Sequence, residues 1–130
     1  MTKKYNKFWA SVTITMPNLP MLSKLGPNAR YMPVPKNKLF QSAKETMEFE
    51  ILQQGARQSP VWERAHLDIT YVASDKRRRD LDNLIASTKP WIDGLVGTVI
   101  VDDSADRLEI SARYEIGDEA ETIMKVSMLQ

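Results

Sequence analysis

Two aspartates directly follow a run of four basic residues in this chain. The stretch KRRRDLDNL, residues 76–84, contains Asp80 and Asp82 with Leu81 between them. In an extended segment, residues i and i+2 point the same way with Cα atoms about 6.5 to 7 Å apart. Both carboxylates could then be aimed at one point while Leu81 faces inward. This geometry suits a cation shared by Asp80 and Asp82.

A third aspartate could join this pair. Asp103 follows about twenty residues later, after a predicted helix and a short extended stretch that could return the chain beside Asp80 and Asp82. Two carboxylates about 5 Å apart repel by roughly 3 kcal/mol at an effective dielectric near 20, against a folding stability of about 5 to 15 kcal/mol. A divalent cation would remove that cost, and ligands that are all oxygen suit Mg²⁺ or Mn²⁺, which retain water and substrate phosphate. We therefore predict a metal site formed by Asp80, Asp82 and Asp103, and phosphate chemistry there.

Basic residues near this predicted site could hold a polyanion. Lys89 would lie about two helical turns after Asp82, where its ammonium could stabilise a scissile phosphate. A long loop, residues 17–36, holds five of the seven prolines and several cations, and its Tyr31 could stack on DNA bases. The basic residues expected to contact DNA phosphates are Lys76, Arg77, Arg78, Arg79, Lys24 and Arg30.

Each of these residues also has a simpler interpretation. Either Asp80 or Asp82 could be the N-cap of the following helix, and the Asp102–Asp103 pair is also typical of a turn. A basic run is usually a solvated surface, and Lys89 could be a solvated lysine before a proline. The single histidine, His66, has no second histidine near it and is expected to be structural rather than a ligand.

Composition excludes several classes of protein. The chain has 130 residues, of which 42% are hydrophobic and 27% charged, and this predicts one folded domain spanning residues 1–130. The net charge of +1 gives no overall reason to expect nucleic-acid binding, so the case depends on where the charges lie. The absence of cysteine excludes disulfides and thiolate metal sites. Without an apolar run long enough for a signal peptide or membrane span, we expect a cytoplasmic protein with no membrane partner.

The hydrophobic periodicity predicts an α+β fold. Strands are expected at residues 8–16 and 65–73, with a helix at residues 38–57 that ends at Gly55. A second helix should follow Asp82 and be interrupted by Pro90, and residues 107–116 and 121–129 should pair as a β-hairpin. The predicted order is strand, helix, strand, helix, strand, strand, giving a small mixed sheet with two helices packed on it. The residues assigned to the buried stripe of the first helix are Leu39, Phe40, Ala43, Met47, Ile51 and Leu52, and Trp9, Trp62 and Trp91 are expected in the core.

Three segments together resemble a known family. The run RRRDLDNL, then KPWIDGLVG, then VDDS, within residues 75–110, is similar to the core of the RusA-type Holliday junction resolvases, bacterial and phage endonucleases that act on four-way DNA junctions. The resemblance implies a small α+β homodimer that requires Mg²⁺, with Mn²⁺ able to substitute, and that makes paired symmetric nicks. It gives metal-binding roles to Asp80, Asp82 and Asp103, a supporting role to Asp102, and junction-backbone contacts to Arg77, Arg78 and Arg79. The family's catalytic lysine aligns with Ala86, so Lys89 matches only if the helix has one extra turn, although the spacing from Lys89 to Asp93 is unchanged.

Three functions fit these observations. The first is a Mg²⁺-dependent endonuclease that resolves four-way junctions, whose near two-fold symmetry would be matched by a two-fold dimer. The second is a catalytically impaired protein that binds junctions or branched DNA, which the shifted lysine makes credible. The third is a small-molecule phosphohydrolase, for which the arginine run would be ordinary surface.

Overall fold

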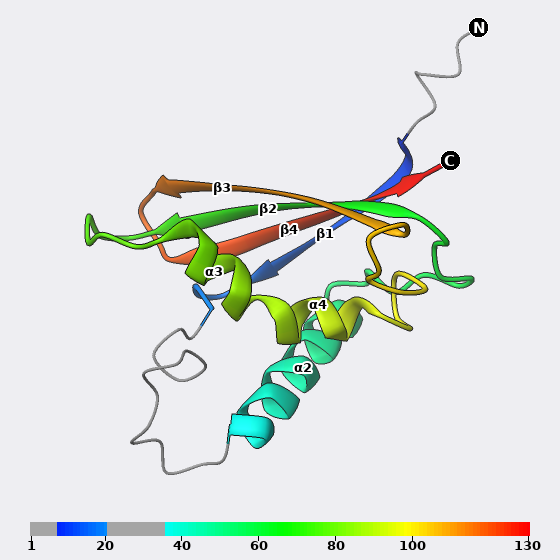
Figure 1. Cartoon of the computed structure of the whole chain (residues 1–130), viewed down its shortest axis with the longest axis horizontal. Helices are drawn as coiled ribbons and strands as arrows, with labels where there is room; N and C mark the ends of the chain where they lie inside the picture. Colours follow the sequence, from blue (N-terminus) through cyan, green and yellow to red (C-terminus); the bar gives the residue numbers. More distant parts are fainter. Residues whose placement is uncertain (1–7, 21–35) are drawn as a thin grey trace, which may run out of the picture.

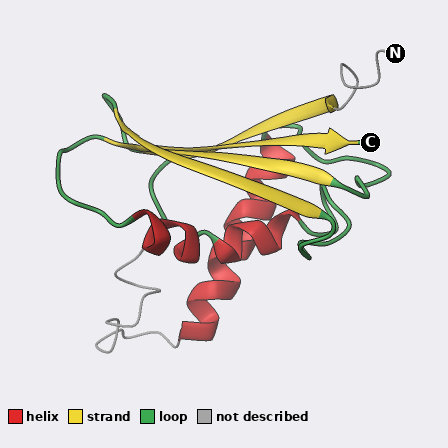
Figure 2. Ribbon diagram, turned by 45° about the horizontal axis from the view of Figure 1, so that its top comes forward, coloured by secondary structure: helices red, strands yellow, loops and turns green. Residues whose placement is uncertain are grey.

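A four-stranded sheet covered on one face by helices forms the molecule (Figures 1 and 2). The structure is a computed structural model and describes residues 8–20 and 36–130. The strands are β1 (Phe8–Met16), β2 (Ala65–Ala73), β3 (Leu108–Ile116) and β4 (Glu121–Leu129). The helices are α2 (Lys36–Gln53), α3 (Leu81–Ser87) and α4 (Lys89–Leu95). The α+β class and the mixed sheet are confirmed, with three helices where two were predicted.

The strand order is β1-β4-β2-β3, with β4 antiparallel to both of its neighbours and β2 parallel to β3. The prediction that residues 107–116 and 121–129 form a hairpin is therefore wrong, because β4 lies between β1 and β2. Burial explains this order, since β4 has buried residues along its length and takes a central position, whereas most of β3 is exposed or half-buried. A further consequence is that β1, β2 and β3 run in one direction and end at the same end of the sheet.

The core lies between the sheet and the helices. Alternation along each strand places one set of side chains against the helices, and burying each large apolar side chain contributes about 1.5 to 3 kcal/mol. Trp62 and Trp91 are buried in this core as predicted, while the side chain of Trp9 lies outside the described part of the structure. The buried core residues include Ile14, Met16, Met47, Ile51, Leu67, Ile69, Tyr71, Leu84, Ile92, Leu95, Met124 and Val126.

Helix α2 ends close to where the sequence predicted. Gly55 has φ +68°, and the N–H of Ala56 donates to Ile51 O at 2.9 Å, the arrangement of a glycine C-terminal cap. The predicted apolar stripe is wrong for Leu52, whose exposed fraction is 68%. The stripe actually packs on α4 through Met47, and a Cβ added to Gly94 would lie 2.9 Å from Met47 Cβ. Only glycine therefore permits this close approach of α2 and α4.

The helix predicted after Asp82 is split in two at Thr88. Pro90 lies in the first turn of α4, so the predicted interruption at this proline is confirmed. The stretch TVIV, residues 98–101, contributes only isolated bridges, from Ile100 to Trp62 and to Val96. None of the helices in the described ranges combines the length and the apolar character needed to cross a bilayer.

Candidate functional site

The charged segment connects the C-terminal end of β2 to the start of α3 (Figure 1). Asp80 is the N-cap residue of α3, with φ −90° and ψ 128°, but its side chain makes no capping hydrogen bond. Asp82 lies in the first turn of α3, where its Oδ1 accepts a hydrogen bond of 2.9 Å from the N–H of Asn83. Both side chains are exposed. Helix capping therefore gives the Asp80 carboxylate no structural role.

The local geometry of these two aspartates differs from the prediction. The segment was expected to stay extended through Asp82 with Leu81 facing inward, but α3 begins at Leu81. Leu81 has an exposed fraction of 39%, so it is not a core residue. Because helical residues two apart do not share a face, Asp80 and Asp82 are not aligned by strand alternation. Their carboxylates instead flank the first residue of a helix.

Arg79 anchors the basic segment to the sheet. Its Nη1 and Nη2 lie 2.8 and 3.2 Å from Oδ1 and Oδ2 of Asp75, and Nη1 also donates to the Tyr114 hydroxyl at 3.1 Å. The hydrogen bonds from Arg79 lower the pKa of Asp75 to about 2, and those to Asp75 raise the pKa of Arg79. Arg79 therefore positions the segment against β3, with only 14% of its side chain exposed. The basic side chains that remain exposed are Lys76, Arg77 and Arg78.

A buried pair of hydroxyl groups fixes the junction between α3 and α4. Thr88 Oγ1 donates to Leu84 O at 2.7 Å, so the Tyr71 hydroxyl, at 2.6 Å from Thr88 Oγ1, must donate to it. Both residues have an exposed fraction of 0%, and burial raises the pKa of Tyr71. Thr88 immediately precedes Lys89, so this bond from β2 fixes where α4 begins.

Lys89 and Asp103 are brought together by the fold. Lys89 Nζ lies 2.5 Å from Asp103 Oδ2 and 2.8 Å from Asp93 Oδ1. The bond from Lys89 lowers the pKa of Asp103, and the bonds to Asp103 and Asp93 raise the pKa of Lys89. The sequence did not assign a role to Asp93, although its position four residues after Lys89 on one helix was a usable signal. The lysine that the resemblance placed in the active site is therefore an ion-pair partner of one predicted metal ligand.

The loop that carries Asp103 is tied to the segment just before β2. The N–H of Trp62 donates to Val99 O at 2.8 Å, and the N–H of Val101 donates to Trp62 O at 2.9 Å. Two hydrogen bonds on either side of Ile100 thus hold the chain just before the paired aspartates. They leave Asp102 exposed and Asp103 half-buried beside Lys89.

The three predicted metal ligands are not gathered into one cluster. Within residues 8–20 and 36–130, no three aspartate, glutamate or histidine side chains lie close enough to hold a metal ion together. Asp103 is bound to Lys89, whereas Asp80 and Asp82 lie at the start of α3. Their carboxylate oxygens are the donor type that Mg²⁺ and Mn²⁺ prefer, so metal ligation by these residues stays a prediction. The predicted DNA contacts Lys24 and Arg30, and also Tyr31, lie outside the described residues.

Comparison with known proteins identifies no relative. The chain matches no protein-family model, and no curated protein matches its sequence.

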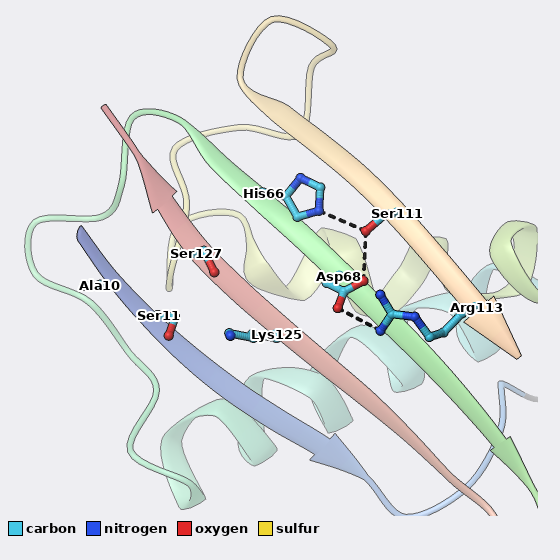
Figure 3. A pocket seen from close by; sticks show the side chains of 8 residues that line it. All are labelled: Ala10, Ser11, His66, Asp68, Ser111, Arg113, Lys125 and Ser127. Atoms are coloured by element: carbon cyan, nitrogen blue, oxygen red, sulfur yellow. Dashed lines mark hydrogen bonds and ion pairs between the residues drawn. The ribbon is translucent and has the colours of Figure 1, made fainter. Parts of the chain in front are cut away.

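The open face of the sheet carries a polar network that the sequence did not reveal (Figure 3). Ser111 Oγ donates to Asp68 Oδ1 at 2.8 Å, and Arg113 Nη1 donates to Asp68 Oδ2 at 3.0 Å. His66 Nε2 lies 2.9 Å from Ser111 Oγ, so the lone histidine links β2 to β3. Burial raises the pKa of Asp68, but the bonds from Ser111 and Arg113 outweigh it, and the pKa lies below its ordinary value. The residues around this groove of about 600 Å³ are Ala10, Ser11, His66, Asp68, Ser111, Arg113, Lys125 and Ser127.

Proposed function

We propose that this protein is a cytoplasmic, Mg²⁺-dependent endonuclease that resolves four-way DNA junctions by paired symmetric nicks, and that it acts as a homodimer. The observation that carries the proposal is the ion pair between Lys89 and Asp103, 2.5 Å long, between two segments of the family resemblance. It joins the lysine of KPWIDGLVG to the aspartate of VDDS. The third segment of the resemblance, RRRDLDNL, supplies two exposed carboxylates at the start of the preceding helix.

The proposed roles follow from side-chain chemistry. Asp80, Asp82 and Asp103 would hold the metal ion, with Asp102 beside them, but the three carboxylates would have to move together to do so because the structure does not gather them into one cluster. When bound, Mg²⁺ would supply activation of a water molecule and neutralisation of the leaving oxygen. Lys89 would stabilise the negative charge that develops on the phosphate. Lys89 is paired with both Asp93 and Asp103, so its ammonium is held at this place but its charge is offset by two carboxylates until a metal ion binds Asp103.

Binding of the DNA backbone is assigned to the exposed cations of the basic segment. The side chains of Lys76, Arg77 and Arg78 are exposed to phosphates, although Arg77 Nε also lies 3.6 Å from Asp75 Oδ2. Arg79 is held by Asp75 and Tyr114 and positions the segment. Binding through several phosphate contacts should weaken steeply as salt is added.

The decisive experiment replaces one carboxylate. Asp82→Asn should abolish Mg²⁺-dependent incision of a synthetic four-way junction while junction binding is retained, because Asp82 has little structural role. Glu45→Gln, which alters an exposed carboxylate on α2, is the matched control and should cut at the normal rate. If Asp82→Asn also cuts at the normal rate, the site assignment is wrong.

A second candidate is a catalytically impaired protein that binds junctions or branched DNA. It is favoured by the commitment of Lys89 to Asp93 and Asp103, and by the extra helical turn needed to align this lysine with the family. Binding of the junction without incision, with Mg²⁺ and with Mn²⁺, would select this candidate over the endonuclease.

A further inference from the structure

The two edges of the sheet differ in how their backbone groups are satisfied. At the β1 edge, the side-chain amide of Gln54 accepts from the N–H of Thr15 at 2.9 Å and donates to Thr15 O at 3.0 Å. This amide pairs with β1 as a neighbouring strand would. At the β3 edge, no hydrogen bond between described residues, apart from the ladder to β2, involves the backbone of residues 109–116. Unpaired edges template pairing with another chain, so this edge needs a partner or a protective device.

The hydrogen bonds at the two ends of β3 show which residues face outward. The N–H of Ala65 donates to Arg107 O at 2.9 Å, and the N–H of Gly117 donates to Ala73 O at 2.8 Å. In a parallel ladder, residues whose backbone groups bond to the neighbouring strand alternate with residues whose groups point away from it. Odd-numbered residues of β3 therefore bond to β2. The backbone groups that point outward belong to Leu108, Ile110, Ala112, Tyr114 and Ile116.

This edge is apolar on its helix side and charged on its open side. Ile110 and Ile116 are exposed by 45% and 53%. The register places Ile110 beside Leu67, so it lies on the same face as the core yet is not covered. On the open face, Glu109 and Arg113 carry opposite charges on either side of Ser111 (Figure 3 shows Ser111 and Arg113). Within the subunit, Glu109 Oε1 lies 3.2 Å from His66 Nδ1 and Arg113 is bonded to Asp68, so a partner would share these two side chains. An edge of this kind complements an inverted copy of itself.

We propose that β3 pairs antiparallel with β3 of a second copy of this chain, about a two-fold axis at Ser111, so that the two sheets become continuous. In this register Glu109 lies opposite Arg113 of the partner subunit, which is a favourable cross-strand pair formed twice. Ile110 lies opposite Ala112 of the partner subunit, and both have backbone groups that point outward. The two Ile110 side chains meet diagonally across the axis and cover each other.

Charge disfavours the registers that are displaced toward the C-terminal end of β3. Centring the axis on Ala112 would place Glu109 opposite Glu115 of the partner subunit, and like charges directly opposite each other are destabilising. Centring it on Arg113 would place two guanidinium groups opposite each other. The register centred on Ser111 avoids both contacts and keeps the outward-pointing backbone groups aligned for hydrogen bonding.

The β3 edge would be the interface of the homodimer proposed above, and this interface can be tested without DNA. The chain contains no cysteine, so Ser111→Cys introduces a single thiol on the predicted axis. The Ser111 pair would be of the non-hydrogen-bonded type, with Cα atoms about 4.5 Å apart, a distance that allows a disulfide. Mild oxidation should therefore give a disulfide-linked dimer on a non-reducing gel.

The control thiol is Glu109→Cys, which is displaced from its own symmetry mate by four residues, on the order of 13 Å along the strands. It should not link to itself but should link to Arg113→Cys when the two variants are mixed. Linkage of Glu109→Cys to itself, with none for Ser111→Cys, would overturn the register. A dimer in sedimentation experiments that gives no linkage with any of these thiols would overturn the edge but keep the proposed dimer.

A substitution tests the edge without any thiol. Ile110→Lys should convert the dimer to a monomer in sedimentation velocity, while Phe49→Lys, which changes an even more exposed apolar residue on α2, should not. A wild-type monomer would overturn both the edge and the proposed dimer. Linkage through Ser111→Cys in a protein that never cuts a junction would support the edge and reject the endonuclease.

Discussion

The buried hydroxyl pair between β2 and the α3–α4 junction can be tested by a double-mutant cycle. Tyr71→Phe removes the donor, and Thr88→Val removes the acceptor together with the bond from Thr88 to Leu84 O. The double variant removes both hydroxyl groups, so no buried hydroxyl is left without a hydrogen-bond partner. Each change keeps nearly the same side-chain shape, so the differences report hydrogen bonding.

The expected magnitudes follow from burial. Tyr71→Phe should lower the free energy of unfolding by about 1 kcal/mol, the usual net value of one hydrogen bond. Thr88→Val should cost more, about 1 to 3 kcal/mol, because it leaves the Tyr71 hydroxyl buried without an acceptor. The double variant should be more stable than the sum of the single effects predicts, by on the order of 1 kcal/mol.

Urea unfolding followed by tryptophan fluorescence measures these changes, since Trp91 lies in α4 close to Thr88. With m of about 1 to 3 kcal/mol per molar urea, a change of about 1 kcal/mol shifts the midpoint by roughly 0.3 to 1 M. Thr13→Val, an exposed threonine of β1, is the control and should change stability by less than about 0.5 kcal/mol. If the two single effects add to the double effect within about 0.3 kcal/mol, the hydroxyls are not coupled and the reasoning fails.

Three further predictions concern packing, pH and binding. Gly94→Ala should lower the urea midpoint, because overpacking against Met47 costs about 1 to 3 kcal/mol whereas the higher helix propensity of alanine stabilises by only about 1 kcal/mol. An unchanged midpoint would show that α2 shifts away from α4 and relieves the contact. Because the pKa of Asp75 is lowered from 3.8 to about 2, its bond to Arg79 should stabilise the segment above pH 4 and be lost as the pH falls through 2. The Arg79 side-chain NMR signals report this loss, and signals that stay unchanged well below pH 2 would contradict the prediction. Arg78→Ala should weaken junction binding for every sequence and reduce the salt slope by about 1, whereas Lys38→Ala on α2 should leave both unchanged.

Hydrophobic periodicity, glycine and proline predicted most of the helices and strands, because these sequence features lie within each helix or strand or at its ends. The strand at residues 65–73 has the predicted bounds, Gly55 ends the first helix, and Pro90 marks the break between α3 and α4. The pairing of β3 and β4 was predicted wrongly because the short connection suggested a hairpin. What decides the order is how much apolar surface each strand buries against helices that lie far away in sequence, and no local pattern contains that information.

The site was predicted in part for a similar reason. Spacing could place Lys89 on a helix and Asp103 on a later loop, but their contact depends on how Trp62 holds that loop. The alignment of Asp80 and Asp82 was wrong because the helix begins at Leu81, two residues earlier than a segment extended through Asp82 would allow. The hydrogen-bond network around Asp68 was not predicted. Its residues lie on two strands that are more than forty positions apart in the sequence, and only the register of β2 with β3 makes them neighbours.

The central position of β4 has a consequence for how the chain folds. Before Glu121 is present, β1 has no strand to pair with and β2 can pair only with β3 in parallel. The ladder between β1 and β4 joins residues about a hundred positions apart, and such distant pairings form slowly. We therefore expect that a chain under synthesis holds its earlier strands open, with apolar faces accessible to chaperones, until the final strand inserts and closes the sheet in one cooperative step.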